Sequence, residues 1–289
     1  MSVAYPYDWV RYLPDGRLIL SEHRSYSMPF EIREFDETVT YYDPAKPWNI
    51  DCLKTEASVK SPNAAAYTNA CFTWDGKRWF GIARGAITSS TSERYFLQVN
   101  RETAWDIADA SSPQLHFNIS VDKSAYLSTG QFSKWTLSED IVAMAVSGNG
   151  LYVYYLAGGS PYNLYMRRLE EPFEINGMRM AVAAAVPLSS VRNGTYRAFQ
   201  FSPDGYRLVV MSSGESTTSS ITCLVELTLS VAWDISTAVV GRSFFPNEAS
   251  GSPVGYATTF CIDDQQRFMY IVYRNPSYHI RQYSLPTEA

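Results

Sequence analysis

A hairpin element recurs along the chain, and this repetition constrains the fold more than any other feature of the sequence. The element is an alternating apolar strand, a turn that usually contains Asp-Gly or Asn-Gly, and a second alternating strand. Its five copies are Val10–Leu20, Cys71–Phe80, Met144–Val153, Phe199–Val210 and Phe260–Tyr270, the last without the glycine. Asp-Gly and Asn-Gly can adopt the positive φ values of a tight turn between two strands. The sequence therefore predicts five β-hairpins.

A second marker follows each of the first four hairpins: an aromatic residue, an acidic or amide residue, and isoleucine. Its copies are Trp48–Ile50, Trp105–Ile107, Phe173–Ile175 and Trp233–Ile235. An alternating strand precedes each copy, and Ile280–Pro286 supplies that strand in the fifth unit. Turn positions 16, 76, 150, 205 and 266 are 60, 74, 55 and 61 residues apart, and the aromatic residues are 57, 68 and 60 apart. The two markers therefore recur at similar spacings and indicate the same repeating unit.

Each unit has room for four strands, because segments such as Ala181–Pro187 and Thr237–Arg242 follow the aromatic residue. A four-stranded unit cannot bury both of its faces alone, so the units must stack. Radial stacking of such sheets produces a β-propeller. We predict one all-β domain over residues 1–289, a β-propeller of about five four-stranded blades. The approximate blades are 8–60, 67–120, 140–187, 195–243 and 255–289.

One insertion leaves the number of blades open. Residues 118–140 lengthen the third unit, and Ile119–Thr129 fits either an extra hairpin or a longer outer strand. Six blades are the alternative if residues 118–140 form a degenerate blade. The fifth unit lacks a fourth strand, and residues 1–6 are the candidate to supply it, because a sheet edge needs a partner or protection.

Charge and hydropathy exclude several classes of protein. The net charge is −5, from 24 basic and 29 acidic residues, and no block of five basic residues occurs, so we expect no nucleic-acid partner. The N-terminus lacks the basic and apolar regions of a secretory signal. The longest apolar run, around Met180–Leu188, is far shorter than the roughly 20 residues of a membrane helix. We expect synthesis in a host cytoplasm, without a signal peptide or membrane insertion.

Catalytic chemistry has little support in the sequence. Some five-bladed propellers are glycosidases, which need two or three converging carboxylates. The candidates are Asp8, Asp51, Asp106, Asp234, Asp263 and Asp264. Asp106 and Asp234 belong to the repeated aromatic marker, which favours a structural role, and the S-x-D-x-G-x-T-W motif of sialidases is absent. We therefore predict no catalytic residue and keep a carbohydrate-active enzyme as the alternative.

Metal and cofactor sites are not predicted either. The three histidines, His23, His116 and His279, have no second ligand at metal spacing. The four cysteines, Cys52, Cys71, Cys223 and Cys261, are scattered singly, as buried small apolar residues often are. Polar loops at 88–93, 158–161 and 214–220 are either recognition loops or solvated connections. Their recurrence at one place in the unit favours connections, and the binding residues stay unassigned.

The combined motifs resemble a known family. The residues that carry the resemblance are Phe201–Gly205, with Ser-Pro-Asp-Gly, and Leu227–Ala238, with Ala-Trp-Asp-Ile. They are similar to the propeller repeats of bacteriophage tail fibres, other tail-associated proteins and related bacterial surface proteins. Four units match well and the fifth in part, with departures at Gly148–Gly150, Gln265–Gln266 and 118–140.

The resemblance implies a virion protein of the phage tail. We expect a non-enzymatic structural or adhesive propeller, whose partners are other tail proteins, copies of itself, or a glycan or receptor on the host surface. A bacterial surface-binding propeller is a further alternative. The composition agrees, since charged residues are only 18% and the chain has 21 Tyr. Tyr offers a large apolar face and a hydroxyl at low entropic cost in contact surfaces.

Overall fold

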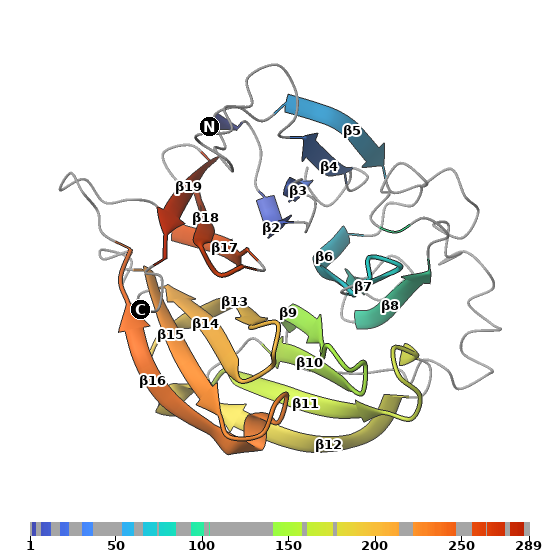
Figure 1. Ribbon diagram of the computed structural model, residues 1–289, viewed down its shortest axis with the longest axis vertical. Helices are drawn as coiled ribbons and strands as arrows, with labels where there is room; N and C mark the ends of the chain where they lie inside the picture. Colours follow the sequence, from blue (N-terminus) through green and yellow to red (C-terminus); the bar gives the residue numbers. More distant parts are fainter. Residues whose placement is uncertain are drawn as a thin grey trace.

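The computed structural model describes residues 2–3, 7–12, 18–22, 31–36, 54–60, 66–73, 75–84, 94–100, 104, 141–157, 161–175, 178–213, 222–246, 256–263, 265–274 and 278–285. Within these residues the chain is all-β, and every pair of adjacent strands is antiparallel (Figure 1). The prediction of an all-β fold is confirmed. No helix in this part of the chain is long and apolar enough to cross a membrane.

The strands form five sheets in the described part of the chain, each built from strands that follow one another in sequence. The first sheet contains β2 (Tyr7–Tyr12), β3 (Leu18–Glu22), β4 (Glu31–Asp36) and β5 (Lys54–Lys60). The second contains β6 (Ala66–Phe72), β7 (Arg78–Arg84) and β8 (Arg94–Asn100). The third contains β9 (Ile141–Val146), β10 (Tyr152–Ala157), β11 (Asn163–Leu169) and β12 (Met178–Pro187).

The last two sheets follow the same order. The fourth contains β13 (Thr195–Phe201), β14 (Arg207–Ser213), β15 (Thr222–Leu229) and β16 (Ala238–Phe244). The fifth contains β17 (Tyr256–Ile262), β18 (Phe268–Arg274), β19 (Tyr278–Ser284) and, at its edge, β1 (Ser2–Val3). Short 3₁₀ helices, η4 (Leu188–Ser190) and η5 (Ile235–Thr237), follow β12 and precede β16.

The five sheets surround a common centre (Figure 1). The first strand of each sheet lies innermost, and the inner strands contact one another in the order β2, β6, β9, β13, β17 and back to β2. The fourth strands β5, β12 and β16 lie on the outside.

Apolar residues from facing sheets form the core between them. Tyr154, Leu164, Phe201 and Val225 belong to a cluster shared by the third and fourth sheets. Phe80 joins the second sheet to the third, in a cluster with Val153 and Tyr155, and a further cluster joins the fourth sheet to the fifth. The alternation of the strands causes this arrangement, because successive side chains point to opposite neighbours.

The expected fourth strands are present with shifted ends: β12 begins before Ala181, and β16 runs from Ala238 to Phe244. Residues 105–140, including the 118–140 insertion and Trp105, lie outside the described residues, as does Trp48. The blade boundaries stay predictions.

Candidate functional site

The hairpin turns at the inner strands share one hydrogen-bond pattern. In the turn between β13 and β14, the Ser202 amide donates to the Arg207 carbonyl and the Gly205 amide to the Ser202 carbonyl. Asp204 accepts from Ser202 Oγ at 2.5 Å and from the Tyr206 amide at 3.0 Å. These two hydrogen bonds lower the pKa of the Asp204 carboxyl below its ordinary value, and the bond from Ser202 has the larger effect. The aspartate of the repeated turn therefore stabilises the turn itself.

The same arrangement recurs with different side chains. Thr73 with Asp75, and Ser147 with Asn149, occupy the positions of the Ser–Asp pair in the second and third sheets. In the fifth sheet a single residue, Asp263, replaces this pair. It accepts hydrogen bonds from the Arg267 and Phe268 amides, at 2.6 and 2.9 Å. Asp263 is buried, and its second oxygen also contacts Arg267 Nε at 3.3 Å.

The aromatic marker covers the glycine of the turn in its own sheet. The Trp233 amide donates to the Gly205 carbonyl, and a Cβ on Gly205 would lie 2.3 Å from the Trp233 ring. Phe173 relates to Gly150 in the same way, with the ring 2.5 Å from the position of a Cβ. Both rings also pack against the preceding sheet: Trp233 belongs to the apolar cluster shared by the third and fourth sheets, and Phe173 packs against the cluster that contains Phe80. The aromatic marker therefore joins adjacent sheets as well as covering its own turn.

Side chains from the neighbouring sheet complete these turns. The Tyr154 hydroxyl, on β10, donates to the Trp233 carbonyl at 2.5 Å. Gln200, on β13, accepts from the Ile262 amide at 2.8 Å and donates to the Ile262 carbonyl at 2.9 Å. One amide side chain thereby satisfies both backbone groups of a residue in the next sheet.

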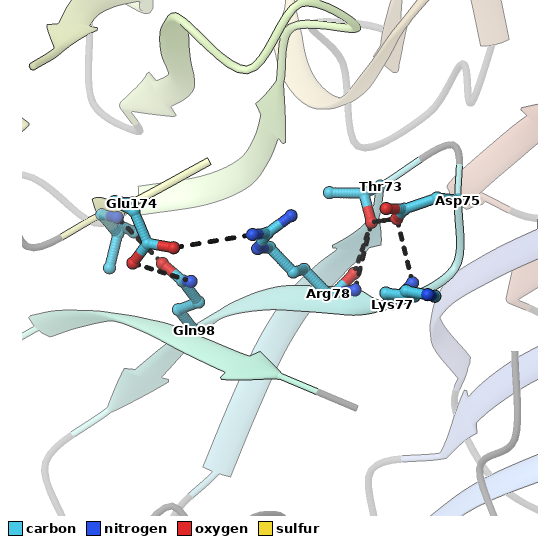
Figure 2. A network of polar contacts seen from close by, with 7 residues as sticks. Thr73, Asp75, Lys77, Arg78, Gln98 and Glu174 are labelled. Atoms are coloured by element: carbon cyan, nitrogen blue, oxygen red, sulfur yellow. Dashed lines mark hydrogen bonds and ion pairs between the residues drawn. The ribbon is translucent and has the colours of Figure 1, made fainter. Parts of the chain in front are cut away.

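The junction of the second and third sheets uses a larger polar network (Figure 2). Buried Gln98, on β8, accepts from the Ile175 amide at 2.8 Å, and its Nε2 lies 3.4 Å from Glu174 Oε2. The Arg78 guanidinium approaches Glu174 Oε1 at 3.6 Å and lies 5.5 Å from the centre of the Phe173 ring. The sequence signal for Gln98 and Gln200 was a polar residue inside an apolar strand.

Some of the candidate catalytic and metal-ligating residues have a structural role, and the others lie outside the described residues or have side chains that are not described. Asp234 caps η5 by accepting from the Ser236 amide at 2.9 Å, and Asp263 organises its turn. Asp51, Asp106, Asp264, His23 and His116 lie outside the described residues, and the side chains of Asp8 and His279 are not described. The polar loops at 88–93, 158–160 and 214–220 also lie outside. Among described residues, no three His, Cys, Asp or Glu side chains are grouped as metal ligands would be.

An exposed apolar surface lies on the outer strand of the fourth sheet. It consists of Val239, Val240 and Phe244 of β16 and of Phe245 directly after it, which are 65%, 48%, 43% and 46% exposed, and we call it the β16 surface. The Arg192 guanidinium lies 5.1 Å from the centre of the Phe245 ring. Val182, on the outer strand β12, is also exposed, and β12 contacts η5, which directly precedes β16. The sequence signal was the Val-Val pair within this strand and the Phe-Phe pair at its end, which sequence reasoning did not identify as a site.

The comparisons with known proteins show similarity of fold only. No protein-family model matches the chain, and no curated protein matches it in sequence. Solved structures that resemble it include a candidate 6-phosphogluconolactonase from Bacteroides fragilis, with 11% identity, a TM-score of 0.46, and coverage of 96% of this chain and 65% of that chain. A second such protein, from Bacteroides uniformis, has 11% identity, a TM-score of 0.42, and coverage of 100% and 70%.

A third similar structure is the β-propeller domain of Cps50 (Swd1) from Myceliophteria thermophila. Its identity is 9% and its TM-score 0.40, with coverage of 98% of this chain and 74% of that domain. Function cannot be transferred at such identities, because one fold supports many activities.

Proposed function

We propose that the chain is a five-bladed β-propeller that acts through surface contacts, as a structural or adhesive component of a bacteriophage tail. Three observations support the propeller: five sheets in chain order, inner strands that contact one another in a ring, and β1 at the edge of the last sheet. Direct contact between β6 and β9 favours five blades over six, because a sixth blade would separate these two strands.

The β16 surface is the observation that carries a contact function. Exposed large apolar side chains gathered along an outer strand are a feature of interaction sites. Four apolar residues within Val239–Phe245 are more than two-fifths exposed, and Arg242 is the only charged residue in the strand. Other tail proteins or further copies of this chain are the partners that fit such a surface. The proposed location in a phage tail is supported by the resemblance of the sequence repeats to those of tail proteins.

A carbohydrate-active enzyme is the alternative function. It requires converging carboxylates, with one acid whose pKa is raised. The described candidates do not fit this requirement, because Asp234 and Asp263 are committed to backbone amides of their own turns.

The first test incubates purified protein with envelope polysaccharide from candidate hosts and measures retention and reducing-end release together. Retention without release supports an adhesive propeller. Release of reducing ends contradicts the proposal and favours the enzyme. If neither occurs, the proposal requires the chain to be found in purified phage particles, and its absence from them would contradict the structural role.

A variant of the β16 surface tests the contact mechanism. We expect Val240→Lys to weaken binding of the chain to particles or to itself, because a charge desolvated in an apolar interface is costly. Thermal unfolding should change little, since Val240 is exposed. The matched control is Arg242→Lys, which keeps the charge of the strand. Equal binding by Val240→Lys and the control would exclude this surface as the interface.

A further inference from the structure

Asparagine followed by glycine occurs at three places in the chain: Asn149–Gly150, Asn176–Gly177 and Asn193–Gly194. In such a pair the glycine nitrogen can attack the asparagine side-chain carbonyl, because glycine has no Cβ to obstruct the approach. The first and third pairs lie within the described residues, whereas Asn176 and Gly177 lie outside them. The two described pairs differ in their surroundings, and this difference decides which of them can react in the folded protein.

Asn149–Gly150 is held by hydrogen bonds in the turn of the third sheet. The Gly150 amide donates to the Ser147 carbonyl at 2.9 Å, and the Gly150 carbonyl accepts from the Phe173 amide at 2.8 Å. The Asn149 side-chain oxygen accepts from Ser147 Oγ at 2.7 Å and from the Leu151 amide at 3.0 Å. Gly150 is also buried, with the Phe173 ring packed on it. Attack by the Gly150 nitrogen would break several of these bonds, so the fold opposes the reaction here.

Asn193–Gly194 lies between η4 and β13 and lacks this support. Neither residue belongs to a strand or a 3₁₀ helix, and Asn193 is exposed. In the described part of the chain, no residue forms a hydrogen bond with the Asn193 side chain or with the Gly194 amide. The Gly194 nitrogen can therefore approach the Asn193 side chain without the loss of a hydrogen bond.

We propose that Asn193 is a deamidation site in the folded protein, and that the fold protects Asn149 from the same reaction. The Gly194 nitrogen forms a bond to Asn193 Cγ, the bond between Cγ and the side-chain nitrogen breaks, and the Gly194 proton leaves with that nitrogen as ammonia. The product of this step is a succinimide. One water molecule then opens the ring and leaves aspartate or isoaspartate at position 193, which adds one negative charge to the chain.

The new charge appears next to the β16 surface. Arg192 directly precedes Asn193, and its guanidinium lies against the ring of Phe245, which belongs to that surface. Deamidation therefore places a carboxylate one residue away from a cation that contacts the β16 surface. The reaction itself depends only on Asn193 and Gly194, and it does not require this surface to be an interface.

Peptide mapping by mass spectrometry tests the proposal on the full chain, incubated at mildly alkaline pH in the folded state and in concentrated urea. In the folded chain, aspartate and isoaspartate should accumulate at position 193 at least about tenfold faster than at position 149, because reaction at Asn149 requires local opening of its turn. In urea the two rates should agree within about threefold, since unfolding removes the difference in surroundings.

Two variants serve as controls. Asn193→Gln should prevent the reaction at position 193 without changing thermal unfolding, because the position is exposed and the longer side chain disfavours ring closure. Ser147→Ala removes the hydroxyl that bonds to Asn149 and should speed the reaction there while the rate at Asn193 stays the same. Two results would overturn the proposal: equal rates at Asn149 and Asn193 in the folded chain, or an unreacted Asn193 after a time in which the unfolded chain reacts there. Neither depends on polysaccharide or on phage particles, so this inference can fail while the proposed function holds.

Discussion

At the scale of single residues, the turn glycine and an aromatic ring pack directly on each other. Gly205 and Gly150 take φ values of +76° and +73°, and a ring occupies the position of each absent Cβ. The sequence predicts the turn, because Asp-Gly is a local signal. It does not predict the ring contact, since Trp233 lies 28 positions after Gly205 and only the folded sheet brings them together.

Gly205→Ala should destabilise the fold by about 2 kcal/mol or more, because the substitution adds both a clash and an unfavourable φ. Gln266→Gly, at the corresponding turn of the fifth sheet, relieves a positive φ without adding a clash but also removes the hydrogen bond that Arg207 donates to the Gln266 side chain, so we expect a smaller loss of stability than for Gly205→Ala. Urea unfolding measures both. Equal effects of the two substitutions would refute the role of the ring.

Buried tyrosines give the protein a stability limit at alkaline pH. Burial raises the pKa of Tyr196 to about 12 from its ordinary 10.0, and burial also raises that of Tyr154. Tyr196 Oη lies 2.8 and 2.7 Å from the Leu188 and Arg192 carbonyl oxygens. Above pH 10 the unfolded chain releases these protons while the folded chain keeps them, so stability falls as the pH rises.

We expect the urea midpoint to decrease steadily between pH 10 and about pH 12. Tyr196→Phe lowers stability at neutral pH by removing a buried hydrogen bond, yet its decline above pH 10 should be shallower. An identical slope in the variant would mean that Tyr196 does not contribute to the alkaline loss.

At the scale of strands and turns, neighbouring sheets complete each other through side chains. The sequence predicted the strands, because period-two alternation is a local property. It could not predict the contacts of Gln200 with Ile262, or of Tyr154 with Trp233, since these depend on how two sheets face each other. It also missed the β16 surface, because exposure is a property of the assembled molecule.

Gln200→Leu should lower the free energy of unfolding by about 1 to 3 kcal/mol, because the Ile262 N–H and C=O lose their partners. Gln265→Leu, at an exposed turn position, should change it by less than about 0.5 kcal/mol. Thermal or urea unfolding of both variants measures the difference. A Gln200→Leu protein as stable as the parent would show that water replaces the amide without cost.

At the scale of the whole molecule, β1 joins the first residues to the last sheet. The sequence analysis named residues 1–6 for that position because the fifth unit lacked a strand, and residues 2 and 3 pair there. The number of blades could not be predicted from the sequence, because the 118–140 insertion fits more than one structure.

Removing residues 1–3 should reduce the free energy of unfolding by only about 1 to 2 kcal/mol, because few ladder bonds are lost. We expect the truncated chain to keep its β-sheet circular dichroism and to unfold at a lower temperature. A truncated chain that does not fold would show that the contacts between β17 and β2 cannot hold the ends together without β1.

The side-chain contacts between sheets also restrict how such a protein can evolve. The three junctions whose side chains the structure describes differ in chemistry: an arginine and a glutamine at Glu174 and Ile175, a tyrosine hydroxyl at Trp233, and a glutamine amide at Ile262. A duplicated or deleted repeat would bring together surfaces that no longer match. Once the junctions of a lineage have diverged in this way, changes in repeat number or order become disfavoured, and variation is confined to the outer strands and loops.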